Sequence, residues 1–157
     1  MTSLLHLPRR SRGLNRRQAV VAIGAAACTL ASGQADATPD AARKLLGTLV
    51  KAEPKAGKVR IAAPEIAENG NSVPLTVTVD SPMTPTDYVR AIHIIADRNP
   101  QPGVASFLLT PDNGKAEVQL RMRLAESQTV IVVAELNDGS AWTATREVKV
   151  TLGGCST

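Results

Sequence analysis

The sequence predicts a mainly β protein, a sandwich of two sheets with a short N-terminal helix. Two observations lead to this fold class. Apolar and polar residues alternate along roughly seven short segments, and Pro, Gly and Asn turns separate these segments at intervals of about ten residues. The aromatic residues are only Tyr88, Phe107 and Trp142, so Val, Ile, Leu and Ala must fill the core.

The helix is predicted to begin at Thr38. Thr38 can serve as the N-cap, and Pro39 suits the first helical position. Apolar residues then recur at helical spacing over roughly three turns, which predicts an amphipathic helix. These residues are Ala42, Leu45, Leu46, Leu49 and Val50. Glu53-Pro54 ends the helix.

After the helix the apolar pattern changes to a period of two, which is typical of strands. Strands are expected over residues 59–61, 73–79, 89–96, 104–110, 116–124, 129–136 and 142–152. Residues 64–74 are predicted to form a loop, and Pro111-Asp112-Asn113-Gly114 a hairpin turn. Residues 89–95 are nearly all apolar, so they form either a central strand covered on both faces or a strand that packs against a partner.

Residues 1–37 are predicted to be a signal peptide that is cleaved. A basic segment precedes the apolar run Ala19–Ala31, and Ala35-Asp36-Ala37 supplies a cleavage site. The pair Arg16-Arg17 favours the twin-arginine route, which exports folded proteins to the bacterial periplasm, over an ordinary secretory leader. Cys28 is interpreted as a leader residue and not as a lipoprotein site.

The leader accounts for the positive charge of the chain. The formal net charge is +4, from 18 Lys and Arg against 14 Asp and Glu. Five of the positive residues and one of the negative ones precede residue 38, so 18 − 5 = 13 and 14 − 1 = 13 remain. We therefore expect no nucleic-acid partner. The apolar run is shorter than the ~20 residues of a membrane-spanning helix, so no membrane partner is expected either.

The expected mature chain has few groups for catalysis. Its one histidine, His93, lies inside an apolar run and is interpreted as a structural or interface residue. A metal site needs three or four convergent ligands, which a single histidine and a terminal cysteine do not supply. No nucleophile-elbow motif and no phosphate-binding glycine loop are present. The sequence therefore predicts a protein that is not an enzyme and holds no metal.

Cys155 is the one cysteine that remains after residue 37, and it lies near the end of the chain behind Gly153 and Gly154. A lone thiol cannot form an internal disulfide. The two glycines give the backbone freedom and remove side-chain bulk, so residues 153–157 are predicted to form a flexible arm that can enter a narrow pocket. The alternative is a frayed tail whose cysteine forms intermolecular disulfides.

The chain resembles the SoxY family, the carrier proteins of periplasmic thiosulfate oxidation (the Sox pathway). The resemblance covers residues 38–157 and rests on several segments in order. They are Ala63–Gly70, Val73-Pro74-Leu75, Asp80-Ser81-Pro82-Met83, Asn99-Pro100-Gln101-Pro102 with Phe107, Arg121-Met122-Arg123-Leu124, Asn137-Asp138-Gly139-Ser140 and Val148–Cys155. The ending Gly153-Gly154-Cys155 is the diagnostic one.

The resemblance implies an immunoglobulin-like sandwich over residues 38–152 and a swinging arm over residues 153–157. It implies that Cys155 carries sulfur covalently and that Gly153 and Gly154 are the hinge, with no cofactor besides the bound sulfur. The implied partners are a SoxZ-like subunit, a SoxAX-like cytochrome, a SoxB-like hydrolase and, where present, a sulfane dehydrogenase. The family commonly ends Gly-Gly-Cys-Gly-Gly, whereas Ser156-Thr157 follow the cysteine here.

Two other functions remain open from the sequence. The chain could be a non-catalytic binding module that forms a disulfide-linked dimer through Cys155. It could also be a stand-alone thiol oxidoreductase, which would need a second, resolving cysteine. Residues 38–157 do not contain one.

Overall fold

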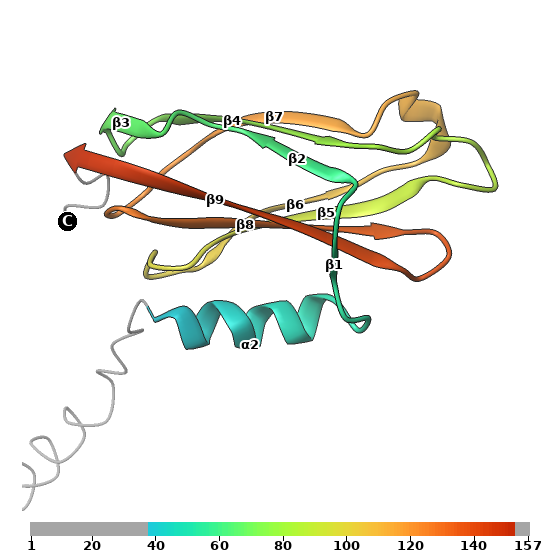
Figure 1. The fold of residues 1–157 in the computed structure, drawn as a ribbon, viewed down its shortest axis with the longest axis horizontal. Coiled ribbons are helices and arrows are strands. Elements are labelled where there is room, and N and C mark those ends of the chain that lie inside the picture. The colour runs from blue at the N-terminus through green and yellow to red at the C-terminus, as the bar shows by residue number, and fades with distance from the viewer. Residues whose placement is uncertain (1–37, 153–157) are drawn as a thin grey trace, which may run out of the picture. The chain divides into compact units, whose positions relative to one another are not determined.

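The computed structural model describes residues 38–152, which form one helix packed on a sandwich of two sheets (Figure 1). The helix is α2 (Pro39–Leu49), and a short 3-10 helix, η1 (Pro111–Asn113), follows β6. The strands are β1 (Lys55–Ala56), β2 (Val59–Ala62), β3 (Ile66–Asn69), β4 (Val73–Val79), β5 (Val89–Ala96), β6 (Gly103–Leu108), β7 (Glu117–Met122), β8 (Gln128–Leu136) and β9 (Ala141–Leu152). The mainly β fold predicted from the sequence is confirmed. The predicted signal peptide, residues 1–37, lies outside the described residues.

Helix α2 begins as its sequence predicts. The hydroxyl of Thr38 accepts a hydrogen bond from the backbone N–H of Ala41 at 3.3 Å, and Pro39 occupies the first turn. The helix buries Ala42 fully and lies against the outer face of the larger sheet, where Val50 packs with Val133 and Ala141. Half-buried leucines of α2 extend this contact, so the helix covers one face of that sheet.

The larger sheet has six strands, in the order β1-β9-β8-β5-β6, with β3 also paired to β9. Strand β5 lies between β8 and β6 and pairs antiparallel with both. All of its residues except Arg90 are buried. The apolar segment 89–95 is therefore a central strand, and the alternative that it packs against a partner is not needed to explain its composition.

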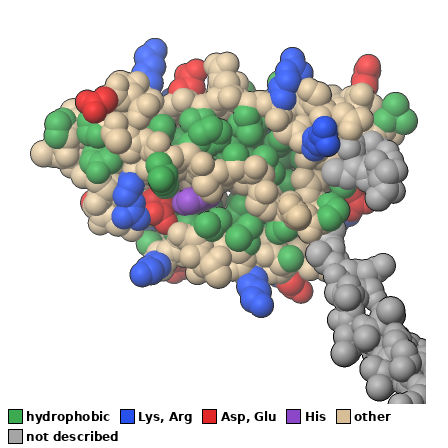
Figure 2. Space-filling view, turned by 180° about the vertical axis from the view of Figure 1, so that it is seen from behind, with side chains coloured by type: hydrophobic (Ala, Val, Ile, Leu, Met, Phe, Trp, Pro, Cys, Tyr) green, Lys and Arg blue, Asp and Glu red, His purple; other side chains and the backbone are tan. Residues whose placement is uncertain are grey.

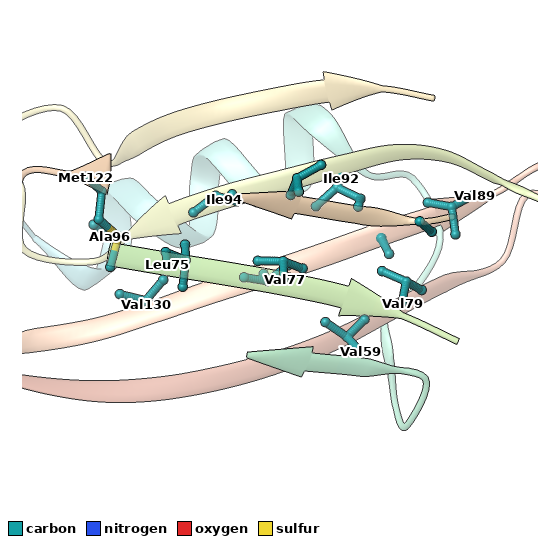
Figure 3. Packing of buried hydrophobic residues seen from close by; sticks show 14 of the residues in the cluster. Val59, Leu75, Val77, Val79, Val89, Ile92, Ile94, Ala96, Met122 and Val130 are labelled. Carbon is teal, nitrogen blue, oxygen red and sulfur yellow. The ribbon is translucent and has the colours of Figure 1, made fainter. Parts of the chain in front are cut away.

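The smaller sheet has three antiparallel strands in the order β2-β4-β7. Strand β4 alternates buried and less buried residues, with Val73, Leu75, Val77 and Val79 inward. These side chains meet those of Ile92, Ile94 and their neighbours between the two sheets (Figure 3). The core is thus aliphatic, as the low aromatic content predicts.

Two features of the fold differ from the sequence prediction. Residues 64–74, expected to be a loop, contain strand β3, which pairs parallel with the end of β9. Strand β1 was also not expected, and it pairs parallel with the beginning of β9. Strand β1 has only two residues, and in β3 only Ala67 is buried, so neither strand shows a period of two. The pairing of both strands is set by a partner far away in the sequence.

The predicted hairpin at residues 111–114 is wrong. Residues Pro111–Asn113 form η1 with Gly114 as its C-cap, and the strands on either side belong to different sheets, β6 to the larger and β7 to the smaller. Thr110 and Asn113 form a capping box at this turn. The sequence does mark a turn here, but a turn that joins two sheets uses the same residue types as one that joins two adjacent strands.

Gly57 provides a test of the packing around β1. Its backbone has φ of +144°, and a Cβ atom there would lie 2.8 Å from Cζ3 of Trp142. We expect Gly57→Ala to lower the free energy of unfolding by more than about 1 kcal/mol, because both the backbone conformation and the contact are unfavourable. Urea denaturation followed by Trp142 fluorescence measures this change.

The control is Gly47→Ala in α2, where no atom lies within 4 Å of the added Cβ. Alanine stabilises an exposed helical position by up to about 1 kcal/mol relative to glycine. If both substitutions shift the midpoint equally, Gly57 does not have the packing role assigned to it.

Candidate functional site

The described part of the chain ends at Leu152, the last residue of β9, directly before the predicted site residues in the sequence. Gly153, Gly154 and Cys155 lie outside the described residues, so the structure shows the base of the predicted arm and not the arm itself. Strand β9 and strand β3 end at the same end of the sandwich (Figure 1). The geometry of this end determines where the cysteine segment begins.

Strand β3 holds the end of β9 along one edge. Ile66 is paired with Lys149, Ala67 with Val150 and Asn69 with Leu152. The pairing continues beyond β3, because the backbone N–H of Gly70 donates to the carbonyl of Leu152 at 2.8 Å. The hydroxyl of Thr151 also donates to the carbonyl of Glu68, at 2.8 Å. Thus β9 is hydrogen-bonded as far as Leu152.

Ser127 holds the other edge of β9. The pairing of β8 with β9 reaches only Gln128 and Val148. Beyond it, the backbone N–H of Val150 donates to the hydroxyl of Ser127 at 2.9 Å, and that hydroxyl lies 3.4 Å from the carbonyl of Val150. One side chain therefore extends the pairing where strand β8 has not yet begun. The last residues of β9 are fastened on both sides.

A buried polar network fastens the loop that contains Ser127. Asn99, only 8% exposed, donates to the carbonyl of Arg123 at 2.8 Å. Its side-chain oxygen accepts from the backbone of Ala125 and from the side chain of Gln128, both at 2.9 Å. Gln128, in turn, accepts from the backbone N–H of Arg98. Buried amides with all their partners in place make a loop rigid.

No sequence pattern marks Asn99, Ser127 or Gln128 as residues of this site. Asn99 belongs to the segment Asn99–Pro102, which carries the resemblance to SoxY proteins. A sequence motif could not connect Asn99 with Gln128, because the two residues are 29 positions apart in the chain. Asn99 lies before β6, and Gln128 is the first residue of β8. An asparagine directly before a proline is a turn signal, but it does not reveal what the side chain binds.

The anchored strand end limits how far Cys155 can reach. Fully extended chain spans about 3.3–3.6 Å per residue, so the α-carbon of Cys155 lies within about 11 Å of that of Leu152. This distance keeps the α-carbon of Cys155 near β3, the end of β9 and the Ser127 loop. No cluster of three or more His, Cys, Asp or Glu side chains within residues 38–152 could hold a metal ion there.

His93 lies in the middle of the larger sheet, away from the strand end that carries the cysteine segment. It is 7% exposed, and its Nδ1 lies 2.8 Å from the hydroxyl of Ser106 on β6. Glu135 lies near it and is ion-paired with Arg90. Burial lowers the pKa of His93, partly offset by the charge of Glu135. These contacts fit the interpretation of His93 as a structural residue.

The lowered pKa of His93 predicts how stability depends on pH. The unfolded state, with an ordinary pKa of about 6.5, binds a proton more readily than the folded state. Below about pH 6.5 the proton therefore favours unfolding, and the contribution of His93 is lost progressively as the pH falls toward its lower folded pKa. We expect the melting temperature to fall between about pH 7.5 and 5, and to fall less in His93→Gln. An equal fall in both proteins would contradict this assignment.

The described residues define a class of protein: a β-sandwich whose last strand, β9, is held on both edges up to the residues that precede Gly153-Gly154-Cys155 in the sequence. The family model for sulfur oxidation protein SoxY matches residues 42–155. The chain belongs to the SoxY family. The match ends at Cys155, so Ser156-Thr157 lie beyond the part that the family model covers.

Solved structures agree with this assignment. The SoxY sulfur carrier protein from Chlorobium limicola f thiosulfatophilum is 38% identical, with a TM-score of 0.59, over 70% of this chain and 96% of that one. Superoxide reductase from Ignicoccus hospitalis is 20% identical, with a TM-score of 0.54, over 76% and 98%. That of Nanoarchaeum equitans is 11% identical, with a TM-score of 0.52, over 60% and 99%. These two reductases share the fold alone. No curated protein matches the chain.

Proposed function

We propose that this protein carries sulfur covalently during thiosulfate oxidation, with Cys155 as the attachment residue and Gly153 and Gly154 as the hinge. The single observation that supports this most is that the SoxY family match runs to Cys155. The anchoring of β9 as far as Leu152 adds a physical reason, since a short hinged segment on a fixed base gives partner enzymes a defined starting point for the thiol.

The chemistry needs two partner enzymes. One accepts the electrons that are released in loading, and the other activates water for hydrolysis. In the loading step, the thiolate of Cys155 and thiosulfate form an S–S bond and give up two electrons to a cytochrome of the SoxAX type. The product is Cys–S–S–sulfonate. A SoxB-type hydrolase then adds water, releasing sulfate and two protons and leaving the persulfide on Cys155. In this scheme the chain is the substrate of both enzymes and not a catalyst.

The proposed setting is the periplasm, reached by the twin-arginine route together with a SoxZ-like subunit. A folded complex can pass through that route, so one leader on residues 1–37 would serve both subunits. No helix within residues 38–152 is long and apolar enough to span a membrane. Equal amounts of the two subunits in a purified periplasmic complex would support this part of the proposal, and a SoxZ-like protein that never co-purifies would contradict it.

Mass spectrometry of the C-terminal peptide tests the carrier function. Protein from thiosulfate-grown cells should carry sulfonate-terminated and persulfide sulfur on the peptide that contains Cys155. The alternative is a binding module that forms a disulfide-linked dimer through Cys155. Non-reducing electrophoresis would then show a dimer that reductant separates, and the C-terminal peptide would lack any added sulfur.

A further inference from the structure

The outer face of the smaller sheet is left uncovered by the described residues. Helix α2 packs on the larger sheet, on the other side of the sandwich (Figure 1). In Figure 2, charged side chains project from the side of the smaller sheet, at the top of the view. The outward side chains of β4 are small, since Pro74, Thr76 and Thr78 alternate with the buried ones. Another molecule can therefore contact this face.

Two adjoining hollows lie on this face, one on each side of β4. The first, of about 330 Å³, is lined by residues 74–76 of β4 and residues 119–121 of β7. The second, of about 380 Å³, is lined by residues 61–64, by the same outward residues of β4 and by Arg146 of β9. Each hollow contains one charged residue, which is Arg121 in the first and Arg146 in the second. Both hollows are therefore positively charged.

The two guanidinium groups are held by neutral acceptors. Nη1 of Arg121 donates to the hydroxyl of Ser72 at 3.3 Å, and Nη2 of Arg146 donates to the carbonyl of Ala63 at 3.4 Å. Neither arginine forms an ion pair within residues 38–152. A guanidinium group has five N–H donors, so most of the donors of both arginines remain available to a ligand.

Carboxylates are the groups that suit the two hollows. Arginine binds a carboxylate through two parallel hydrogen bonds. Arg121 lies on β7, and Arg146 contacts the residue after β2, two strand spacings or about 10 Å away. Two carboxylates on one surface therefore fit the pair better than one small anion does. Glu65 and Glu147 share a third hollow with Arg146 and line neither of these two.

The composition of this face favours a protein over a lipid surface. Membrane-binding surfaces combine basic residues with Trp, Phe or Leu. The exposed large hydrophobic residues within residues 38–152, Ile66, Leu108 and Leu152, line neither hollow. Arginine is enriched in protein interfaces. A second copy of this chain does not fit, because a two-fold contact through this face would place arginines against arginines.

This face lies close to the base of the cysteine segment. The backbone N–H of Gly70 donates to the carbonyl of Leu152 at 2.8 Å. Pro74 follows Gly70 by four residues, so their α-carbons lie within about 14 Å of each other. A protein bound at the two hollows would therefore be near the end of β9.

We propose that the two hollows dock an acidic surface of a partner enzyme that receives Cys155. Carboxylates of the partner pair with Arg121 and Arg146. The inference rests on the proposed function, because the partner is one of the enzymes that act on Cys155. Pairing of this kind mainly raises the rate of association, and salt weakens it.

Steady-state kinetics with the SoxAX-type cytochrome and the SoxB-type hydrolase test the docking surface. The substrate is this chain, unloaded with thiosulfate for the cytochrome and loaded with Cys–S–S–sulfonate for the hydrolase. In the double variant Arg121→Glu with Arg146→Glu, we expect kcat/KM of at least one enzyme to fall about tenfold or more, through KM and not kcat. About 0.5 M sodium chloride should reduce the difference to less than about threefold.

The matched control is the double variant Lys44→Glu with Lys51→Glu, which changes the net charge by the same amount. Both lysines are exposed, and they lie in or just after α2, on the other side of the sandwich. We expect the control to keep kcat/KM within about twofold of the unsubstituted chain. Both double variants should keep the melting temperature, because all four side chains are exposed.

The outcomes separate the docking surface from the carrier function. Equal kcat/KM for the unsubstituted chain and the arginine variant, with both enzymes, would overturn the docking surface and leave the carrier function intact. An equal loss in the lysine control would also overturn it, since net charge would then be responsible. Arginine-dependent binding to phosphatidylglycerol vesicles, with unchanged kinetics, would assign the face to lipid instead. If Cys155 of the unsubstituted chain cannot be loaded, the proposed function is wrong and this inference is wrong with it.

Discussion

Replacing Cys155 with serine is expected to abolish thiosulfate-dependent sulfur oxidation while leaving the fold unchanged. A serine hydroxyl cannot form the S–S bond to thiosulfate, so no intermediate can be held. Residues 38–152, which form the sandwich, do not include position 155. We therefore expect the melting temperature to stay the same. Sulfate production from thiosulfate by cells that express the variant measures the loss.

The chain offers a matched control in its other cysteine. Cys28 lies in the predicted leader, and Cys28→Ser should leave sulfate production as it is in the unsubstituted protein. Sulfate production that persists in Cys155→Ser would rule out the attachment role. If Cys28→Ser alone were inactive, the interpretation of residue 28 as part of a cleaved leader would be wrong.

Replacing Asn99 with alanine is expected to have the largest effect on stability at the base of the arm. The substitution removes one hydrogen-bond partner from the part-buried carbonyl of Arg123, from the part-buried N–H of Ala125 and from the buried side-chain amide of Gln128, which keeps its bond to the carbonyl of Glu126. An unsatisfied buried group costs about 1–3 kcal/mol. We expect the free energy of unfolding to fall by about 2 kcal/mol or more, as measured by urea denaturation.

A local readout separates loosening of the loop from a general loss of stability. In Asn99→Ala, the amide of Val150 should exchange with solvent faster than amides in the centre of β9, because Ser127 no longer has a fixed position. Gln101→Ala is the control, since Gln101 is exposed two residues away and its loss should change stability by less than about 0.5 kcal/mol. Uniformly faster exchange along β9 would contradict the proposed positioning role.

The parts of the fold that could be predicted from the sequence are those that local patterns determine. Thr38 and Pro39 mark the start of α2 because capping is a local interaction. Strand β4 shows a clear alternation because one of its faces is buried. The central position of β5 could be inferred from its continuous apolar run, although the same run was also consistent with a partner interface.

The remaining parts depend on contacts between distant segments. Strands β1 and β3 form because their backbones pair with that of β9. The residues of β1 and of β3 do not by themselves indicate this pairing. Residues 111–114 read as a hairpin turn because nothing in a turn sequence shows which sheet the next strand joins. At the candidate site, Cys155 is proposed from its position behind two glycines and from the resemblance to SoxY proteins. The side chains that fix the base of its segment, Asn99 and Ser127, required the structure.

The most direct test of the carrier function follows the two sulfur atoms of thiosulfate separately. The chain is incubated with its SoxAX-type and SoxB-type partners and with thiosulfate labelled isotopically at either the sulfane or the sulfonate sulfur. Mass spectrometry then locates the label. The proposed scheme predicts that sulfane label remains on the peptide containing Cys155, while sulfonate label appears there first and then leaves as sulfate. Label that never appears on this peptide, with sulfate still formed, would contradict the account.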